Sequence, residues 1–434
     1  MEGITLMHIR RMMIAAAATS SLLLSACGGG AAADPELATP SADAEGALTV
    51  WLMDGSQPET VVEAVNAQFK EKYPNVDVTV ELQQWAGVQD KLTTSMNSSS
   101  APDVVEIGNS LTAKFADAGL LSDLSDVSDD LGADRWLPGL APSGELDGER
   151  YGVPYYGGVR VVMYNKDHFK EAGVEVPTTL DELEQVAAKL AETKGDKASG
   201  YSPFYFPGKF WYGALPFIWA EGGDIAVKDG DEWKGSLDST ESRAGLTRLK
   251  NLVDTYSTAP TDGNEVTNWE VFQEDNVGMV MDSWWAPGAV VGANEAFADK
   301  VGVFPLPGVQ ADKTAPAFFG GSDLAVPEKS DSRGLAVEWV KILTSTDIQT
   351  QLAKEGGVIP NTEAAFTGHE GNDFLLAADE AAKVSAFTPV SPMWGNVEAD
   401  SVLPDMLVKI FSGSSSVDDA TAEANTKVAE ILNG

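Results

Sequence analysis

The chain has 434 residues, more than one hydrophobic core usually serves, and this length predicts two or three domains. It carries 29 basic against 66 acidic residues, a net charge of −37 at pH 7, and so negative a surface repels phosphate backbones and argues against nucleic-acid binding. The single cysteine excludes a disulfide framework, and the hydrophobic content of 43% is typical of a globular rather than a disordered protein.

The N-terminus has the pattern of an export signal. Arg10 and Arg11 precede a small, apolar run over residues 12–24, which is too short to span a membrane comfortably and is typical of a signal-peptide core. The run ends in Leu-Ser-Ala-Cys, and the cysteine is Cys27. This tetrapeptide resembles the lipobox of bacterial lipoproteins, which implies that residues 1–26 are removed and that Cys27 carries the lipid anchor. An ordinary secretory signal followed by a chance cysteine is the alternative.

A flexible tether is expected next. Residues 27–46 are rich in Gly, Ala, Asp, Pro, Ser and Thr and carry almost no apolar bulk. Such a composition is typical of flexible linkers, so the tether would let a folded body stand away from the membrane surface.

Strands and helices then alternate. The apolar segments 47–53, 76–82 and 103–107 are predicted strands. Ser56 and Glu59 have the spacing of a capping box at the start of a first helix. Strands about 30 residues apart with helices between them predict βαβ units and a parallel sheet. The two further helices of this part are predicted over residues 83–98 and 109–118.

A second α/β segment begins near residue 159. Strands are predicted over residues 159–164, 276–282, 301–304 and 322–326, and helices over 179–193, 240–256 and 333–343, with a helical C-terminal end from about residue 372.

Five motifs together resemble the family 1 extracellular solute-binding proteins, the maltose-binding-protein-like group. They are PDVVE at 102–106, YGVPYY at 151–156 leading into VVMYNKD at 161–167, VGMVMDSW at 277–284, GGSDLAV at 320–326 and GGVIP at 356–360. Each motif alone is weak, but all five occur in the order found in that family.

This resemblance implies an α/β, two-lobed periplasmic-binding-protein fold of type II with a hinge between the lobes. The first lobe would comprise residues 47–154 plus 316–371, and the second residues 155–315 plus 372–434. The implied function is that of the sugar-binding lipoprotein of an ABC importer, a monomer on the extracytoplasmic face of the cell membrane. It would deliver its ligand to permease subunits served by a separate ATPase chain, without a cofactor, a metal or catalysis.

A sugar site needs aromatic rings for the apolar C–H faces and planar donors and acceptors for the hydroxyl groups. Ligands of open α/β sheets lie beyond the carboxyl ends of the strands. In the first half of the chain this favours Asp54, Trp85 and Asn109, each of which follows a predicted strand. The structural alternatives are a helix-terminal acid for Asp54, core packing for Trp85 and a helix cap for Asn109.

The remaining candidates lie at the predicted crossings and strand ends. One of the adjacent tyrosines is expected to face the ligand while the other packs, and the same is expected of the tryptophan pair after residue 282. The aromatic segment 204–212 is predicted to be a loop with a stacking platform, although a local hydrophobic core is the alternative. These candidates are Tyr155, Tyr156, Arg160, Trp211, Asp282, Trp284, Trp285, Gly320, Ser322, Asp323 and Trp394.

Other functions are less compatible with the sequence. A polyamine- or peptide-binding protein would share both the fold and an acidic, aromatic cleft, so it remains open. A glycoside hydrolase would need two carboxylates flanking the bond, which composition cannot exclude. The three histidines, His8, His168 and His369, have no ligand-like spacing, and neither a Gly-x-Ser-x-Gly elbow nor a Walker loop occurs.

Overall fold

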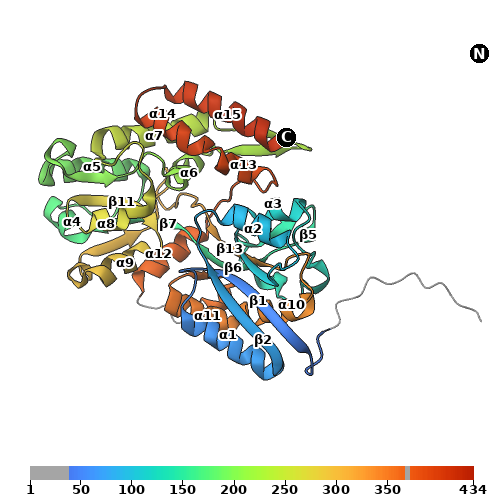
Figure 1. Ribbon diagram of the computed structural model, residues 1–434. Helices are drawn as coiled ribbons and strands as arrows, with labels where there is room; N and C mark the ends of the chain where they lie inside the picture. Colours follow the sequence, from blue (N-terminus) through green and yellow to red (C-terminus); the bar gives the residue numbers. More distant parts are fainter. Residues whose placement is uncertain (1–38, 367–371) are drawn as a thin grey trace, which may run out of the picture. The chain divides into compact units, whose positions relative to one another are not determined.

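Two β-sheets organise the chain (Figure 1). The computed structural model describes residues 39–366 and 372–434, so the predicted signal and Cys27 lie outside the described residues. Residues Thr39–Gly434 form one compact unit. We call the six-stranded sheet with the helices that cover it the first lobe, and the four-stranded sheet with its helices the second lobe.

The sheet of the first lobe has the strand order β14-β6-β13-β3-β1-β2. β1 pairs in parallel with both β2 and β3, as the βαβ pattern predicted, whereas β13 runs antiparallel to β3 and β6. The six strands are β1 (Glu45–Met53), β2 (Asn75–Gln83), β3 (Val104–Gly108), β6 (Val153–Gly158), β13 (Gly320–Ala325) and β14 (Ile359–Pro360).

Alternation along β1 divides the core of the first lobe into two layers. Leu48, Val50 and Leu52 pack with α1 (Glu59–Lys72) and α10 (Arg333–Leu343), while Met53 packs on the opposite face with α2 (Val88–Met96) and α3 (Thr112–Asp117). Successive side chains of a strand point to opposite faces, so a central strand that is largely apolar, as β1 is from Leu48 to Met53, can carry helices on both sides. α11 (Thr346–Gly356) completes the layer that contains α1.

The sheet of the second lobe has the order β12-β7-β11-β8. One face carries a large core with α5, α6, α7 and the C-terminal helices α13 to α15, and the other face carries a smaller core with α8 and α9. Its elements are β7 (Arg160–Asn165), α4 (Lys166–Ala172), α5 (Leu180–Lys194), β8 (Ser202–Tyr205), α6 (Trp211–Ala220), α7 (Thr240–Tyr256), α8 (Asn268–Phe272), β11 (Val277–Ser283), α9 (Ala286–Ala293), β12 (Val301–Phe304), α12 (Asp373–Ala382), α13 (Trp394–Ala399), α14 (Val402–Phe411) and α15 (Val417–Asn433).

The lobes are joined where β6 ends and β7 begins. Gly158 is the last residue of β6 and Arg160 the first of β7, so Val159 alone links a strand of one sheet to a strand of the other. The segment between β12 and β13 makes a second passage between the two sheets. Two hairpins, β4 (Glu145–Leu146) with β5 (Glu149–Arg150) and β9 (Ala226–Asp229) with β10 (Glu232–Gly235), lie outside the main sheets.

Two helix starts differ from the sequence predictions. α1 has Pro58 at its N-cap position and no side-chain cap, because the Ser56 hydroxyl instead donates to the buried Glu106 carboxylate at 2.8 Å. The predicted capping box is therefore wrong. α2 was predicted from residue 83, but it begins at Val88, because β2 continues to Gln83 and Gly87 adopts a left-handed φ of 71° before the helix.

Other boundaries agree closely. The helix predicted over residues 240–256 is α7, and the predicted strand 301–304 is β12. Thr179 caps α5 through its hydroxyl oxygen, which accepts from the Glu182 amide at 3.1 Å. The helix predicted from residue 109 is confirmed but shorter, since α3 begins at Thr112. In the part of the chain that the structure describes, no helix is both long and apolar enough to span a membrane.

Candidate functional site

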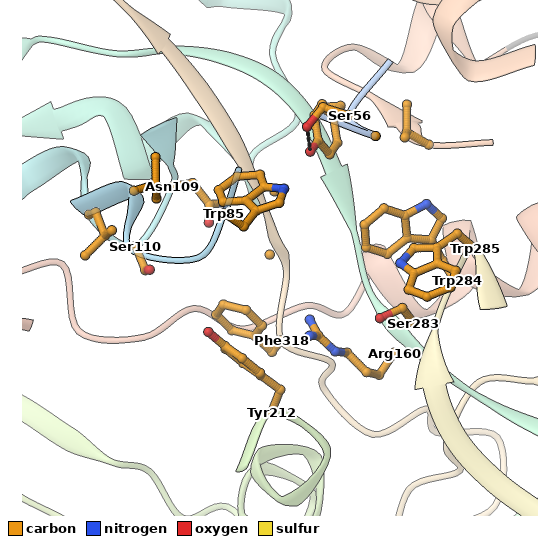
Figure 2. Close-up of a pocket in the computed structure, with 18 of the residues that line it drawn as sticks. Ser56, Trp85, Asn109, Ser110, Arg160, Tyr212, Ser283, Trp284, Trp285 and Phe318 are labelled. Carbon is orange, nitrogen blue, oxygen red and sulfur yellow. Dashed lines mark hydrogen bonds between the residues drawn. The ribbon is translucent and has the colours of Figure 1, made fainter. Parts of the chain in front are cut away.

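A cavity of about 670 Å³ has walls from both lobes (Figure 2). Side chains from several loops and strand ends meet in it: aromatic rings, amides, hydroxyls and a few charged groups. Those that matter for the argument are Asp54, Ser56, Trp85, Asn109, Ser110 and Tyr156 from the first lobe and Arg160, Tyr212, Ser283, Trp284, Trp285, Phe318 and Glu398 from the second.

The first-lobe wall is built at the carboxyl ends of parallel strands. Asp54 follows β1, Trp85 comes shortly after β2 and Asn109 follows β3, and all three line the cavity. The Asp54 carboxylate accepts from the Gln84 amide at 3.0 Å, and Asn109 donates to the Phe319 carbonyl at 3.3 Å. Because neighbouring parallel strands end at one edge of their sheet, three residues distant in sequence meet there.

A buried carboxylate holds part of this wall in place. Glu106, in the middle of β3, accepts from the Met53 amide at 2.7 Å and from the hydroxyls of Ser56 at 2.8 Å and Ser322 at 2.7 Å. The Tyr156 hydroxyl donates to the same carboxylate at 3.3 Å. Burial raises the pKa of Glu106, and these hydrogen bonds oppose the rise. Ser56 and Tyr156 line the cavity, so Glu106 fixes their hydroxyl groups from behind.

Arg160 stands at the start of β7 and projects into the cavity (Figure 2). Its guanidinium carbon lies 4.4 Å from the centre of the Tyr212 ring and 5.9 Å from that of Phe318. The Nη2 atom is 3.5 Å from the Glu265 carboxylate, and the side chain is only 12% exposed. A planar cation stacked on aromatic rings is held rigidly and can donate to oxygen atoms of a ligand.

The paired tryptophans after β11 have different surroundings, as adjacent residues should. The Trp284 amide donates to the Val159 carbonyl at 3.0 Å, and its ring covers Gly158, where an added Cβ would lie 2.0 Å from a ring carbon. Trp285 is 44% exposed, as is Trp85. Trp284 therefore packs at the hinge with an edge on the cavity, while Trp285 offers an open ring face.

Eight of the predicted contacts line the cavity. They are Asp54, Trp85, Asn109, Tyr156, Arg160, Trp284, Trp285 and Gly320. The structure does not bring the other six to the wall. Tyr155 is fully buried and donates to Gln57 at 3.2 Å, Ser322 bonds to Glu106, and Trp211 packs against Tyr212 with ring centres 3.8 Å apart.

The remaining three predicted contacts are buried supports. Asp323 accepts from Thr112 at 2.7 Å and from Ser143 at 2.9 Å, and burial raises its pKa to about 6. Burial also raises the pKa of Asp282 to about 7, since only part of this carboxylate is hydrogen-bonded. Trp394, predicted to lie in a loop, instead begins α13 as a fully buried side chain.

Sequence reasoning missed several wall residues. Tyr212 lies in the aromatic segment that was singled out, but Trp211 was preferred. Glu106, which supports the wall from behind, gave a usable signal, a carboxylate inside an otherwise apolar strand. Glu398 gave none, because its place depends on how α13 packs against the rest of the molecule.

Glu398 is a partly buried carboxylate on the second-lobe wall. It accepts from the Trp394 indole N–H at 2.6 Å and is hydrogen-bonded to Ser110, which belongs to the first lobe. Burial raises the pKa of Glu398, while these bonds and the positive charge of Lys114 oppose the rise. Lys114 itself donates to Asn396 at 3.0 Å, so α3 and α13 meet across the cleft.

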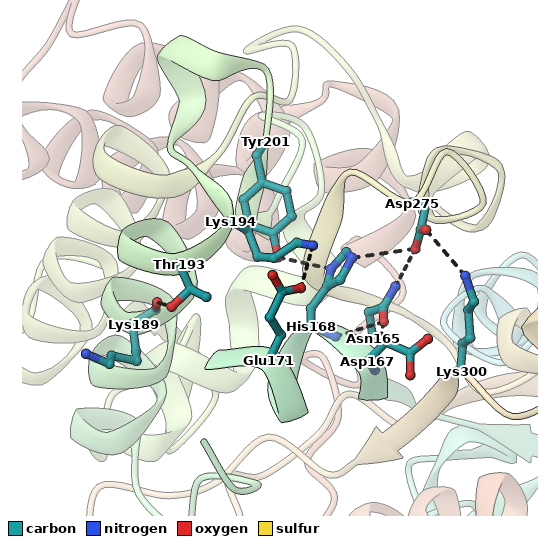
Figure 3. Close-up of polar contacts among 10 residues, drawn as sticks. All are labelled: Asn165, Asp167, His168, Glu171, Lys189, Thr193, Lys194, Tyr201, Asp275 and Lys300. Carbon is teal, nitrogen blue, oxygen red and sulfur yellow. Dashed lines mark hydrogen bonds and ion pairs between the residues drawn. The ribbon is translucent and has the colours of Figure 1, made fainter. Parts of the chain in front are cut away.

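A second polar cluster lies away from the cavity (Figure 3). His168 contacts Tyr201 at 3.1 Å and Asp275 at 3.6 Å, while Asn165 and Lys300 bind the same aspartate. Burial lowers the pKa of His168, and none of these side chains lines the cavity. Within residues 39–366 and 372–434, no three His, Cys, Asp or Glu side chains are grouped to hold a metal ion. The contacts of Asn165 and His168 with Asp275 therefore connect the start of α4 to the turn before β11.

Comparison with known families now decides the class of protein. The model of the bacterial extracellular solute-binding proteins matches residues 54–350, more than half of the chain. The chain belongs to this family. The family assignment confirms the resemblance that the five motifs predicted.

Curated relatives span nearly the same length as this family member. The diacetylchitobiose binding protein DasA of Streptomyces coelicolor is 36% identical over 390 residues, which are 88% of this chain and 90% of the relative. A maltooligosaccharide ABC transporter solute-binding lipoprotein of Streptococcus pneumoniae is 26% identical over 394 residues, 88% of each chain.

Solved structures agree on the fold. The GacH receptor of Streptomyces glaucescens superposes with a TM-score of 0.78 at 23% identity, covering 90% of this chain and 99% of that one. The cyclic alpha-maltosyl-1,6-maltose binding protein of Arthrobacter globiformis gives 0.75 at 23% identity, covering 90% of this chain and all of that one. The fold is thus the predicted two-lobed type II architecture of periplasmic binding proteins.

Proposed function

We propose that this family member is the carbohydrate-binding component of an ABC importer, and that the cavity between its lobes holds the sugar. The observation that carries the proposal is the cavity itself, which combines open indole faces with fixed hydroxyl, amide and guanidinium groups. Trp85 and Trp285 offer the faces on which sugar C–H groups stack. Tyr156, Asn109 and Arg160 offer hydrogen-bonding groups already oriented by contacts with neighbouring groups.

The relatives support a sugar ligand. Their names refer to diacetylchitobiose and maltooligosaccharides, both short oligosaccharides. The relative that is 36% identical is named for an N-acetylated disaccharide, so such disaccharides belong at the head of any ligand panel. A cavity of about 670 Å³ lies within the range of sites that bind small molecules, roughly 300–1,000 Å³.

Several finer features form part of the same proposal. The protein would be anchored by lipid on Cys27, act as a monomer without catalysis and deliver ligand to permease subunits driven by a separate ATPase. The predicted division lies at residues 154/155, 315/316 and 371/372, and we propose to move the first of these points to Val159, because β6 (Val153–Gly158) pairs within the six-stranded sheet. The second point would lie between β12 and β13, and the third near residue 372. The match of a lipoprotein relative supports the anchor, and the direct passage from β6 to β7 supports a hinge at Val159.

A thermal-shift screen tests the ligand class. Purified protein would be heated with mono- and disaccharides, including N,N′-diacetylchitobiose, cellobiose and maltose, and with spermidine and a tripeptide as non-sugar ligands. A ligand at 100 times its Kd should add about 2.7 kcal/mol of stability. A rise with one sugar class supports the proposal. A rise with spermidine or the peptide alone would overturn the sugar assignment and favour the alternative solute class.

A further inference from the structure

The charged groups of the cavity wall are unevenly balanced. Asp54 and Glu398 are its carboxylates and Arg160 its one strong base, among the described lining residues. The Arg160 guanidinium already has a partner, because Glu265 lies 3.5 Å from it behind the wall. The charge of Glu265 thus balances that of Arg160, and the cavity wall keeps the negative charges of two carboxylates. The whole chain has a net charge of −37.

Neither remaining carboxylate is neutralised by direct contact. In the described part of the chain no lysine or arginine nitrogen lies within 4 Å of Asp54 or Glu398, although such pairs are common elsewhere on the surface. Their partners are neutral: the Gln84 amide for Asp54, and the Trp394 indole with the Ser110 hydroxyl for Glu398. The charge of Lys114 acts on Glu398 from a distance, but the Lys114 ammonium group donates to Asn396.

The two carboxylates approach the cavity from opposite lobes. Asp54 follows β1 of the first lobe, whereas Glu398 lies on α13 of the second. Aromatic side chains form much of the cavity wall, including Tyr212, whose pKa is raised by burial and by the charge of Glu398. Such walls strengthen the field of an unpaired charge, so a ligand between the lobes experiences a negative potential on two sides.

We propose that this arrangement is a charge filter, in which Glu398 is a specificity-determining residue that excludes acidic sugars. This inference rests on the proposed function and narrows its substrate class. Uronic acids, sialylated sugars and sugar phosphates are rejected by like-charge repulsion. Uncharged sugars, and sugars carrying an amino group, are accepted because carboxylate oxygens accept hydrogen bonds from O–H and N–H donors. The positive charge of Arg160 is largely offset by the nearby Glu265 carboxylate, although the guanidinium can still donate to ligand hydroxyl groups.

The test uses disaccharides that share one glycosidic skeleton and differ in charge. Cellobiose is neutral, cellobiouronic acid carries one carboxylate, and chitobiose without acetyl groups carries ammonium groups. Isothermal titration calorimetry at pH 7.5 and low salt would measure each Kd with the purified full chain. Cellobiose should bind at least tenfold more tightly than cellobiouronic acid, and deacetylated chitobiose should bind no more weakly than cellobiose.

Two variants assign the effect to named residues. The gap is the ratio of the Kd for cellobiouronic acid to the Kd for cellobiose. Glu398→Gln should reduce this gap at least threefold, because the substitution removes the charge and keeps an acceptor oxygen. Glu265→Gln should narrow it as well, since it frees the Arg160 cation for the ligand. Asp400→Asn is the matched control: it removes a carboxylate that is paired with Lys427 just beyond α13 and does not line the cavity. This control should leave the gap unchanged.

The outcomes separate the two proposals. If cellobiouronic acid binds as tightly as cellobiose, or if Glu398→Gln leaves the gap unchanged, the charge filter is wrong while sugar binding stands. If no member of the series binds, and the wider panel gives no sugar ligand, the proposed function fails instead. High salt should narrow the gap in the unmodified protein, because it screens the repulsion.

Discussion

At the residue scale, the adjacent Trp284 and Trp285 have different roles: the first packs at the hinge, and the second exposes its ring to the cavity. Trp284 covers Gly158 at the passage between the lobes, so its removal would disturb the hinge as well as the cavity. Trp285 is 44% exposed and lines the cavity without belonging to any of the buried cores. Only Trp285 therefore permits a clean test of stacking.

Replacing Trp285 with alanine should weaken sugar binding without lowering stability. Loss of a stacked, desolvated indole costs about 1–3 kcal/mol, and each 1.4 kcal/mol is tenfold in Kd. Calorimetric titration gives the affinity and a thermal melt without ligand gives the stability. Trp285→Phe should retain part of the affinity. Normal binding by the alanine variant would remove Trp285 from the site.

Asp282 makes a pH-dependent contribution to stability. Burial raises its pKa from 3.8 to about 7 in the folded protein, so the native state keeps a proton that the unfolded chain releases. The contribution is complete below pH 4 and is lost as the pH rises towards 7. Asp282→Asn should flatten the fall of Tm between pH 4 and pH 7.

Melting curves of the unmodified protein and the variant at several pH values measure this difference. Asp323→Asn should act in the same direction over a lower window, because the pKa of Asp323 is raised only to about 6. Parallel pH profiles for the unmodified protein and Asp282→Asn would show that the Asp282 carboxylate is not the group responsible.

At the scale of elements, α3 and α13 form the contact that depends on closure. Lys114 donates to Asn396 at 3.0 Å, and Gly395 lets the helices approach, since an added Cβ would lie 3.0 Å from Leu111 and 2.9 Å from Lys114. The helices belong to different lobes. The contact can therefore stabilise the closed form without touching a ligand.

Asn396→Ala should reduce affinity by shifting the protein towards the open form. Removing a hydrogen bond of about 0.5–1.5 kcal/mol should weaken binding roughly 2- to 10-fold, because the apparent Kd rises as the closed fraction falls. Calorimetric titration of the variant and of the unmodified protein with any identified sugar measures the change in apparent Kd. Lys409→Ala is the control, since Lys409 pairs with Glu423 inside the second lobe. An equal loss in both variants would refute the closure argument.

At the scale of the whole molecule, ligand binding should bring the lobes together. The chain offers a convenient background, because its only cysteine is Cys27. In a Cys27→Ser chain, dyes on Asp117→Cys and Asp400→Cys would report the separation of two exposed positions, one at the end of α3 and one just beyond α13. Saturating sugar should raise energy transfer between the dyes. No change at saturation would argue against a hinge motion on binding.

The sequence alone determined the secondary structure of the lobes and one wall of the site. Apolar alternation and caps such as Thr179 depend on residues close in the chain, so periodicity identified β1, β3, β12 and α7. The sequence also predicted three cavity residues, Asp54, Trp85 and Asn109, because neighbouring parallel strands place their carboxyl ends at the same edge of the sheet.

Only the tertiary structure decided which of several similar side chains reaches the cavity. Tyr156 rather than Tyr155 lines it, because the neighbouring positions of β6 face opposite sides and Glu106 holds the Tyr156 hydroxyl. Tyr212 rather than Trp211 lines it because α6 turns the Trp211 ring towards Trp394. Glu398 reaches the cavity only because α13 packs beside α3, far away in the sequence, and local pattern carries no record of such packing.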